Sequence, residues 1–126
     1  MRVPLAKRDE STRIEYRAPD PACNPYLAFA CVLAAGLKGI EEGYELPSES
    51  ASNIYEMTNE ERAAEGIRSL PGSLAEAVDL MEESELVAET LGEHVFEWFL
   101  RNKREEFLAY KSSVSQFELD RYLPRL

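Results

Sequence analysis

The stretch from residue 13 to residue 26 joins a strand-like pattern to a helix-like one, and it limits the possible folds of this chain more than any other stretch. Charged and bulky side chains alternate over residues 12–18, which predicts a β-strand with two different faces. Pro19 and Pro21 end that strand, because proline has no N–H to donate to a neighbouring strand. The rest of the sequence holds no clear second strand for pairing, so we expect the natural protein to extend on the N-terminal side.

The remainder of the chain predicts helices. Asn24 and Pro25 mark the start of the first, and Gly43 follows its end. Apolar residues cover more than one side of this helix, so we expect it to be buried. An irregular segment over residues 44–59 follows. Further helical segments are expected over residues 59–62, 74–83, 84–91, 92–110 and 115–126, with Ser73 and Glu76, and Ser115 and Glu118, as capping boxes.

Composition is that of an ordinary globular protein. The 126 residues are 44% hydrophobic and 30% charged, which suits a single domain over residues 1–126. A net charge of −10 argues against binding to nucleic acids or to anionic membranes. Any anionic ligand therefore needs a local cluster of positive charge, and the densest basic stretch covers residues 2–17.

Cellular context follows from the cysteines and from hydropathy. Cys23 and Cys31 are eight positions apart, a spacing that suits buried thiols better than a metal-binding pair or a disulfide framework. The longest apolar run, over residues 26–37, is too short to cross a membrane, and the basic N-terminal stretch does not read as a secretory signal. We expect a cytoplasmic protein.

Three side chains of mixed charge share one face of the predicted strand. Alternation places Arg13, Glu15 and Arg17 on one side, with Ile14 and Tyr16 on the other. Such a row is either a solvated face with cross-strand ion pairs or the wall of an active site. A single carboxylate makes no metal site, because a hard divalent cation needs further oxygen ligands.

The order of residues in this stretch favours the second alternative, the wall of an active site. Residues 13–26 read R-I-E-Y-R-A-P-D-P-A-C-N-P-Y and are followed by L-A-F-A. This resembles the C-terminal signature of type I glutamine synthetases. The resemblance implies an α+β catalytic domain of the glutamine synthetase/guanido kinase-like fold. This excerpt of it would be mainly α-helical, with one or two N-terminal strands.

Site residues follow from the same resemblance. Glu15 stands at the position of a ligand of an active-site Mg²⁺ or Mn²⁺ ion, and Arg17 at that of an arginine that binds the glutamate substrate. The tripeptide that begins at Arg2, thirteen residues before Glu15, matches an R-I-P element whose arginine contacts ATP. Arg13 is a weaker candidate for an ATP contact, with a structural ion pair as the equal alternative. No catalytic residue is assigned within the chain.

Later segments of the sequence also resemble this family, particularly the branch typical of Gram-positive bacteria, thermophiles and archaea. These segments include S-N-I-Y-E-M-T-N-E-E-R and L-G-E-H-V-F-E-W-F. Tyr55 stands where another branch carries a tyrosine that is adenylylated, but the surrounding residues differ, which favours an unmodified loop tyrosine. His94, the only histidine, is expected at the surface or at a subunit interface. Asp20 and Asn24 belong to the motif, and we assign them to a turn and a helix cap.

The resemblance implies that this chain is part of an enzyme that ligates ammonia to L-glutamate through γ-glutamyl phosphate and consumes ATP. Complete members are dodecamers of two stacked hexamers, and each active site is closed by a neighbouring subunit. The isolated chain is expected to be inactive, because the family's other metal ligands and substrate arginines are absent. The alternatives are a sister ligase that uses another amine, and a truncated, non-catalytic interaction module.

Overall fold

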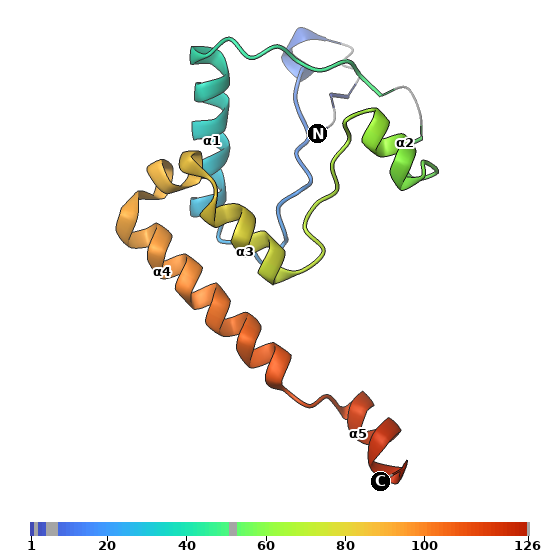
Figure 1. Ribbon diagram of the computed structural model, residues 1–126. Helices are drawn as coiled ribbons and strands as arrows, with labels where there is room; N and C mark the ends of the chain where they lie inside the picture. The colour runs from blue at the N-terminus through green and yellow to red at the C-terminus, as the bar shows by residue number, and fades with distance from the viewer. Residues whose placement is uncertain (2, 5–7, 51–52, 126) are drawn as a thin grey trace. The chain divides into compact units, whose positions relative to one another are not determined.

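A computed structural model describes residues 1, 3–4, 8–50 and 53–125. The chain divides into two units, Met1–Leu70 and Pro71–Leu126, and each is described by itself (Figure 1). The first unit contains a short 3₁₀ turn η1 and the helices α1 and α2, over Asp9–Ser11, Pro25–Glu41 and Asn59–Ala64. The second contains helices α3, α4 and α5 and the 3₁₀ turn η2, over Leu74–Glu82, Glu85–Ser112, Gln116–Tyr122 and Leu123–Arg125.

The mainly helical character predicted from the sequence is confirmed. The described part of residues 12–18 is extended, but it forms no strand there and has only an isolated β-bridge at Glu15. A strand needs a continuous series of paired residues, and the described residues show only this single bridge. The one or two N-terminal strands therefore stay a prediction for a longer chain.

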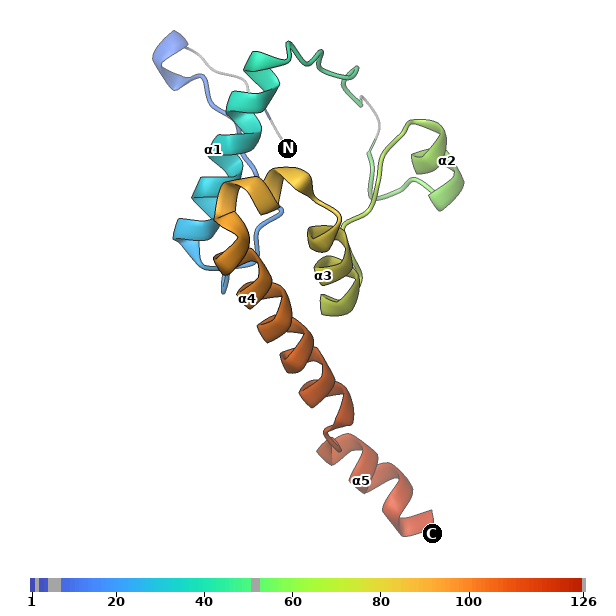
Figure 2. The ribbon, with the colours of Figure 1, turned by 60° about the vertical axis from the view of Figure 1, so that its left-hand side comes forward.

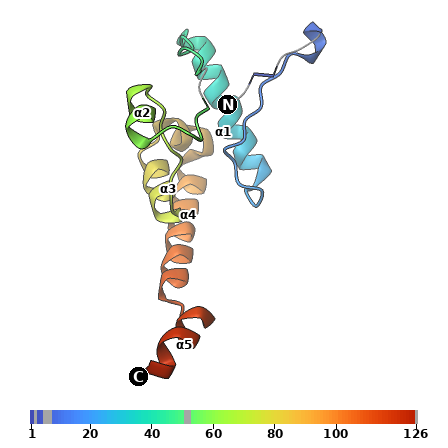
Figure 3. The same cartoon turned by 90° about the vertical axis from the view of Figure 1, so that its right-hand side faces the viewer.

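The predicted turn after the extended segment is present. Asp20 Oδ1 accepts a hydrogen bond from the Ala22 N–H at 2.8 Å, and the Asp20 carbonyl accepts one from the Cys23 N–H at 3.0 Å. The chain reverses here, so the extended segment and α1 run in opposite directions (Figures 1 and 3).

Cys23 is exposed, so the prediction of a buried thiol is wrong for this residue. Cys31 is half-buried in α1, and burial raises the pKa of its thiol.

Helix α1 begins and ends at the residues expected from the sequence. Asn24 Oδ1 accepts hydrogen bonds from the N–H groups of Tyr26 and Leu27, at 3.0 and 3.4 Å. These bonds satisfy donors that have no partner inside the helix. Gly43 follows the C-terminus with a φ of 64°, a conformation that glycine adopts without the steric cost of a Cβ.

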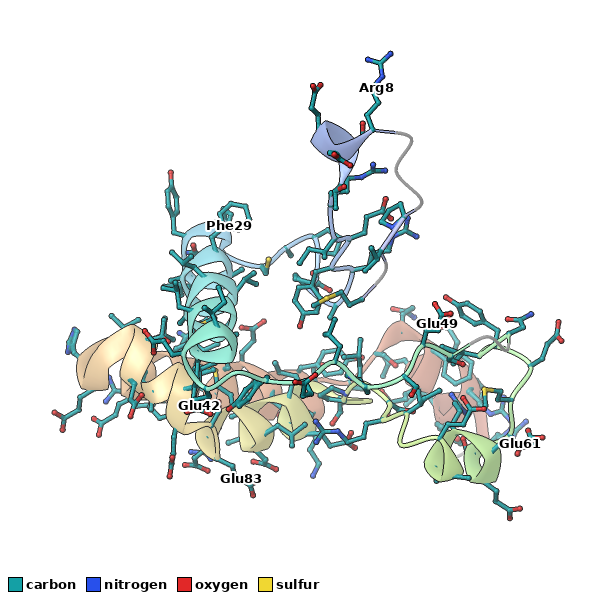
Figure 4. The ribbon with its side chains drawn as sticks, turned by 90° about the horizontal axis from the view of Figure 1, so that it is seen from above. Arg8, Phe29, Glu42, Glu49, Glu61 and Glu83 are labelled. Carbon is teal, nitrogen blue, oxygen red and sulfur yellow. The ribbon has the colours of Figure 1, made fainter. Side chains whose placement is uncertain are left out.

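The prediction that α1 is buried is not met within its own unit. None of its residues is buried, and six large apolar side chains are exposed: Tyr26, Phe29, Val32, Leu33, Leu37 and Ile40. Figure 4 shows Phe29 pointing away from the helix axis. The apolar composition of α1 predicts burial, because such a surface is costly to leave in water, but no part of its own unit covers it in the structure.

In the second unit, α3 packs against α4 (Figure 2). Val78 of α3 and Leu100 of α4 are 3% and 5% exposed and are the buried apolar residues of the described chain. Arg104 of α4 hydrogen-bonds Glu82 of α3 and lies 3.9 Å from the Asp79 carboxylate. The pair is therefore held by a small apolar contact and an ion pair beside it.

Gly92 divides α4 into two helical segments, as its place in the sequence predicts. Its φ of 72° and ψ of 156° are not helical and are accessible to glycine almost alone. Within α3, Val78 is buried and Ala77 and Met81 are half-buried, whereas Leu74 is exposed. Among the described residues, every helix is too short or too polar to cross a membrane.

Side chains cap the remaining helices. Ser115 and Glu118 form the predicted capping box of α5, and Thr58 and Glu61 form one for α2. At α3 only half of the predicted box is present. Ser73 Oγ accepts from the Glu76 N–H at 3.2 Å, but the Glu76 carboxylate accepts from the Gly72 N–H at 2.8 Å, one residue earlier than a box requires.

We expect Leu100→Ala to destabilise the packing of α3 on α4 by about 2–5 kcal/mol, because it removes a buried side chain and leaves a cavity. Leu108→Ala is the matched control. It deletes the same atoms from the same helix, where the side chain is 61% exposed, and should cost about 0.5 kcal/mol or less. Urea unfolding of the chain, followed by far-UV circular dichroism, measures both. Equal costs would contradict the assigned core.

The α5 capping box makes helix formation depend on pH. Hydrogen bonds from the Ser115 N–H and the Ser115 hydroxyl lower the pKa of Glu118 below its usual 4.5. A carboxyl whose pKa is lowered by folding stabilises the folded state above its unfolded pKa, and the contribution is lost as pH falls through the folded pKa. The α5 helix should therefore fray on acidification below about pH 4.5.

Nuclear magnetic resonance titration of the Glu118 carboxyl carbon measures this effect. Ser115→Ala should bring the pKa back toward its usual value and weaken the pH dependence. Ser113→Ala is the control, because the Ser113 hydroxyl donates to the Tyr110 carbonyl and not to Glu118. A Glu118 pKa that is the same in wild type and in Ser115→Ala would rule out the box.

Candidate functional site

Arg13, Glu15 and Arg17 come together on one side of the extended segment, and we call them the Arg13–Glu15–Arg17 clamp. Arg13 Nη2 donates to Glu15 Oε1 at 3.2 Å, and Arg17 Nη2 donates to Glu15 Oε2 at 3.1 Å. Each carboxylate oxygen thus accepts a hydrogen bond from a different guanidinium group. Arg13 also donates through Nη1 to the Ser11 carbonyl at 3.5 Å.

The clamp follows from backbone geometry. Successive side chains of an extended chain point to opposite sides, so residues two apart lie on the same side. The predicted grouping of Arg13, Glu15 and Arg17 is therefore confirmed. Ile14 and Tyr16, expected on the opposite side, are both exposed in the structure.

The three side chains differ in their exposure to solvent. The Glu15 side chain is 23% exposed, against 58% for Arg13 and 76% for Arg17. Two positive charges on one negative charge leave the clamp with a local surplus of one positive charge. The whole chain has a net charge of −10 and repels anions at long range, whereas the positive charge of the clamp attracts an anion locally.

Glu15 is a suitable donor for a hard divalent cation, since Mg²⁺, Mn²⁺ and Ca²⁺ prefer carboxylate oxygen. The residues around it do not complete a metal site. In the described part of the chain, no group of three or more histidine, cysteine, aspartate or glutamate residues is placed to hold a metal ion. Any other ligands must come from elsewhere. The predicted ATP contact Arg2 lies outside the described residues.

Two further residues of the motif have the structural roles expected for them. Asp20 closes the turn and Asn24 caps α1. Together they fix where the extended segment ends and where the helix begins, and they use their side-chain oxygens to do so. Neither therefore needs a role in ligand binding.

A pocket of about 430 Å³ in the first unit was not predicted from the sequence. It is lined by Asn53, Glu56, Met57, Glu61, Ala64 and Glu65. Glu61 accepts hydrogen bonds from the Thr58 N–H and hydroxyl, and the former is the main cause that lowers its pKa. This carboxylate therefore serves the cap of α2. The capping pattern T-N-E-E is the only sequence signal for the feature.

Three further residues lie at the surface. Tyr55 is in a turn and fully exposed, as expected for a loop tyrosine. His94 is exposed on α4, as expected. Trp98 is half-exposed, and the Arg101 guanidinium lies 4.2 Å from the centre of its ring. That cation–π contact stabilises the helix surface.

A second pocket, of about 170 Å³, lies between α3 and α4. Arg104 stands at its edge, where its hydrogen bond to Glu82 lowers the pKa of that carboxyl and raises the pKa of the guanidinium. The ion pair that links the two helices thus keeps both groups charged. The pocket belongs to the packing of α3 on α4.

Comparison with known proteins gives one consistent result. The family model described as "Glutamine synthetase, catalytic domain" matches residues 1–122. A glutamine synthetase of Mycolicibacterium smegmatis is 54% identical over 125 residues, which is 98% of this chain and 28% of that protein. One of Methanosarcina mazei is 50% identical over 126 residues, which is 100% of this chain and 28% of that protein.

A third relative, a glutamine synthetase of Thermotoga maritima, is 47% identical over 123 residues, or 98% of this chain and 28% of its own length. The chain thus spans little more than a quarter of the relatives that it matches. The match covers the clamp, the turn and every helix through the end of α5 at Tyr122. The chain belongs to the glutamine synthetase catalytic-domain family.

Proposed function

We propose that this chain is the C-terminal part of the catalytic domain of a glutamine synthetase, which ligates ammonia to L-glutamate through γ-glutamyl phosphate and consumes ATP. The observation that carries the proposal is the Arg13–Glu15–Arg17 clamp. It places a carboxylate suited to a divalent cation directly beside two groups suited to anions, in a chain 54% identical to a glutamine synthetase. Transfer of a phosphoryl group to a carboxylate needs this combination of charges.

The three side chains take different roles in this proposal. Glu15 is a ligand of one Mg²⁺ or Mn²⁺ ion, and Arg17 binds the glutamate substrate. Arg13, and Arg2 outside the described residues, contact ATP. When bound, the metal ion neutralises charge on the transferring phosphoryl group. No residue of this chain is assigned a proton transfer.

Ammonia is the proposed amine rather than a polyamine or another amine. Relatives at 46–54% identity across nearly the whole chain are glutamine synthetases, and this supports the ammonia-using ligase over a sister enzyme. The similarity also extends through the site residues, which supports an enzyme over a non-catalytic interaction module. We further propose a cytoplasmic homo-oligomer, a dodecamer in the complete protein.

The isolated chain lacks what the reaction needs. Glu15 is one ligand, and the described residues supply no further cluster for a metal ion. The exposed apolar side of α1 also indicates that other parts of a larger domain cover it. The remaining metal ligands, substrate arginines and neighbouring subunit belong to the rest of the enzyme.

In the full-length enzyme, Glu15→Ala should reduce metal-dependent glutamine formation by about 100-fold or more, because a ligand of the charge-neutralising ion is lost. Glutamine formation with ATP, ammonia and a series of Mg²⁺ concentrations measures the effect. Far-UV circular dichroism should be unchanged. Glu10→Ala, an exposed carboxylate on η1, is the control and should retain activity. Full activity in Glu15→Ala would refute the assignment.

The 126-residue chain alone should release no phosphate above background from ATP in the presence of L-glutamate, ammonia and Mg²⁺. A single carboxylate and two or three arginines do not hold the nucleotide, the ion and the substrate in line. A coupled phosphate assay measures this, with the full-length enzyme as positive control. Turnover by the chain alone would show that its site is complete.

A further inference from the structure

Helix α3 packs on the part of α4 that follows the break at Gly92. Arg104 of α4 hydrogen-bonds Glu82 at the end of α3, although only two residues separate the two helices. In a straight hairpin with so short a connection, Glu82 would lie opposite Glu85, and Arg104 would lie about 28 Å further along α4. The bend near the start of α4 is therefore what brings Arg104 back to α3 (Figure 1).

A straight α4 is the alternative conformation for this stretch. The segments on both sides of Gly92 are helical, whereas Gly92 itself has a φ of 72° and a ψ of 156°. Glycine adopts helical angles as well as these. With helical angles at Gly92, the N–H groups of residues 93–95 would bond to the carbonyls of residues 89–91. The bent form forgoes these hydrogen bonds, so its other contacts have to compensate for them.

Few contacts hold the bent form together. Val78 of α3 and Leu100 of α4 are buried. Beside them, the Arg104 guanidinium hydrogen-bonds Glu82 and lies 3.9 Å from the Asp79 carboxylate, and we call this group of three the latch. All three of its side chains are exposed, and exposed ion pairs stabilise only weakly. The pocket of about 170 Å³ next to the latch shows that the two helices do not fill the space between them.

A row of like charges crosses the break. Exposed glutamates repeat at intervals of four residues, at Glu85, Glu89, Glu93 and Glu97. In a continuous helix, residues four apart are neighbours on one face, and like charges there repel each other. A straight α4 would join the four into a single row, whereas the bend interrupts the row between Glu89 and Glu93. This repulsion favours the bent form, and salt weakens it by screening exposed charges.

We propose that Gly92 is a hinge at which α4 exchanges between the bent form and a straight helix over residues 85–112. The bent form keeps α3 on α4 through the latch. The straight form gains the hydrogen bonds across Gly92, releases α3 and carries the C-terminal end of α4 away from it. Higher ionic strength favours the straight form, because it screens both the attraction in the latch and the repulsion among the glutamates. This device does not depend on the proposed ligase activity.

Gly92→Ala separates the hinge from a fixed elbow. Alanine is strained at a positive φ and is favoured over glycine in a helix, so the ratio of straight to bent molecules should rise about 30-fold or more. Apart from the neighbouring backbone, no atom of the described structure lies within 4 Å of a Cβ added at Gly92, so the change causes no clash in the bent form. Gly36→Ala is the matched control, because Gly36 is a helical glycine of α1 with equally open surroundings.

Arg104→Gln tests the latch without a change of backbone preference. Loss of an exposed ion pair should raise the ratio of straight to bent molecules about two- to five-fold. Arg101→Gln is its control. It removes the same charge from the same helix, where the guanidinium lies over the Trp98 ring and not on α3.

Double electron–electron resonance between two nitroxide labels on the 126-residue chain measures both effects. Leu80→Cys on α3 and Glu105→Cys on α4 place the labels at exposed positions, and Cys23→Ser and Cys31→Ala remove the native thiols. Straightening of α4 should lengthen the distance between the labels by about 25 Å or more. In the labelled parent, the long-distance fraction should rise as sodium chloride is raised from about 0.01 M to about 1 M.

A single short distance in Gly92→Ala and Arg104→Gln, at low and at high salt, would establish the fixed elbow and overturn the hinge. If Gly92→Ala loses its helical circular dichroism, Arg104→Gln decides alone, and a long-distance fraction equal to that of Arg101→Gln overturns the proposal. Amide hydrogen exchange of residues 93–95 completes the test, because a straight helix protects these amides. A long distance without that protection means that α3 has only detached, and it also overturns the hinge.

Discussion

An extended backbone over residues 13–17 is the constraint on which the candidate site depends. Because side chains two residues apart share a side of an extended chain, the Glu15 carboxylate meets a guanidinium group from each direction. A helix over these residues would place Arg13 and Arg17 on one face and turn Glu15 to the opposite one. The prolines that follow and the Asp20 turn protect this geometry, because they keep α1 from extending backward into the segment.

Local chemistry explains why much of the fold was predictable from the sequence. Asn24, Ser115 and Gly92 act through their own backbone neighbourhood, so a few adjacent residues suffice to predict the cap of α1, the cap of α5 and the break in α4. The clamp was predictable for the same reason, since it spans five residues. The box at α3 shows the limit of such rules, because Glu76 reaches Gly72 instead of Ser73.

Features that depend on distant residues were predicted less well. The α1 sequence indicates a buried helix, yet its large apolar residues are exposed because nothing in its unit covers them. Cys23, in the turn before α1, is exposed as well. The pocket near α2 depends on how residues 53–65 fold together, which the T-N-E-E capping pattern alone does not predict. In each case the missing information is a tertiary neighbour.

The small core places a physical limit on what the chain does by itself. Val78 and Leu100 hold α3 on α4, but no buried apolar residue lies beneath the clamp in the described part of the first unit. The proposed phosphoryl transfer needs charged groups fixed to within about 0.5 Å, and exposed arginines on an extended segment do not meet that requirement unaided. Residues 13–17 thus supply charges for the proposed site, whereas its precision has to come from contacts that the described part of the first unit does not provide.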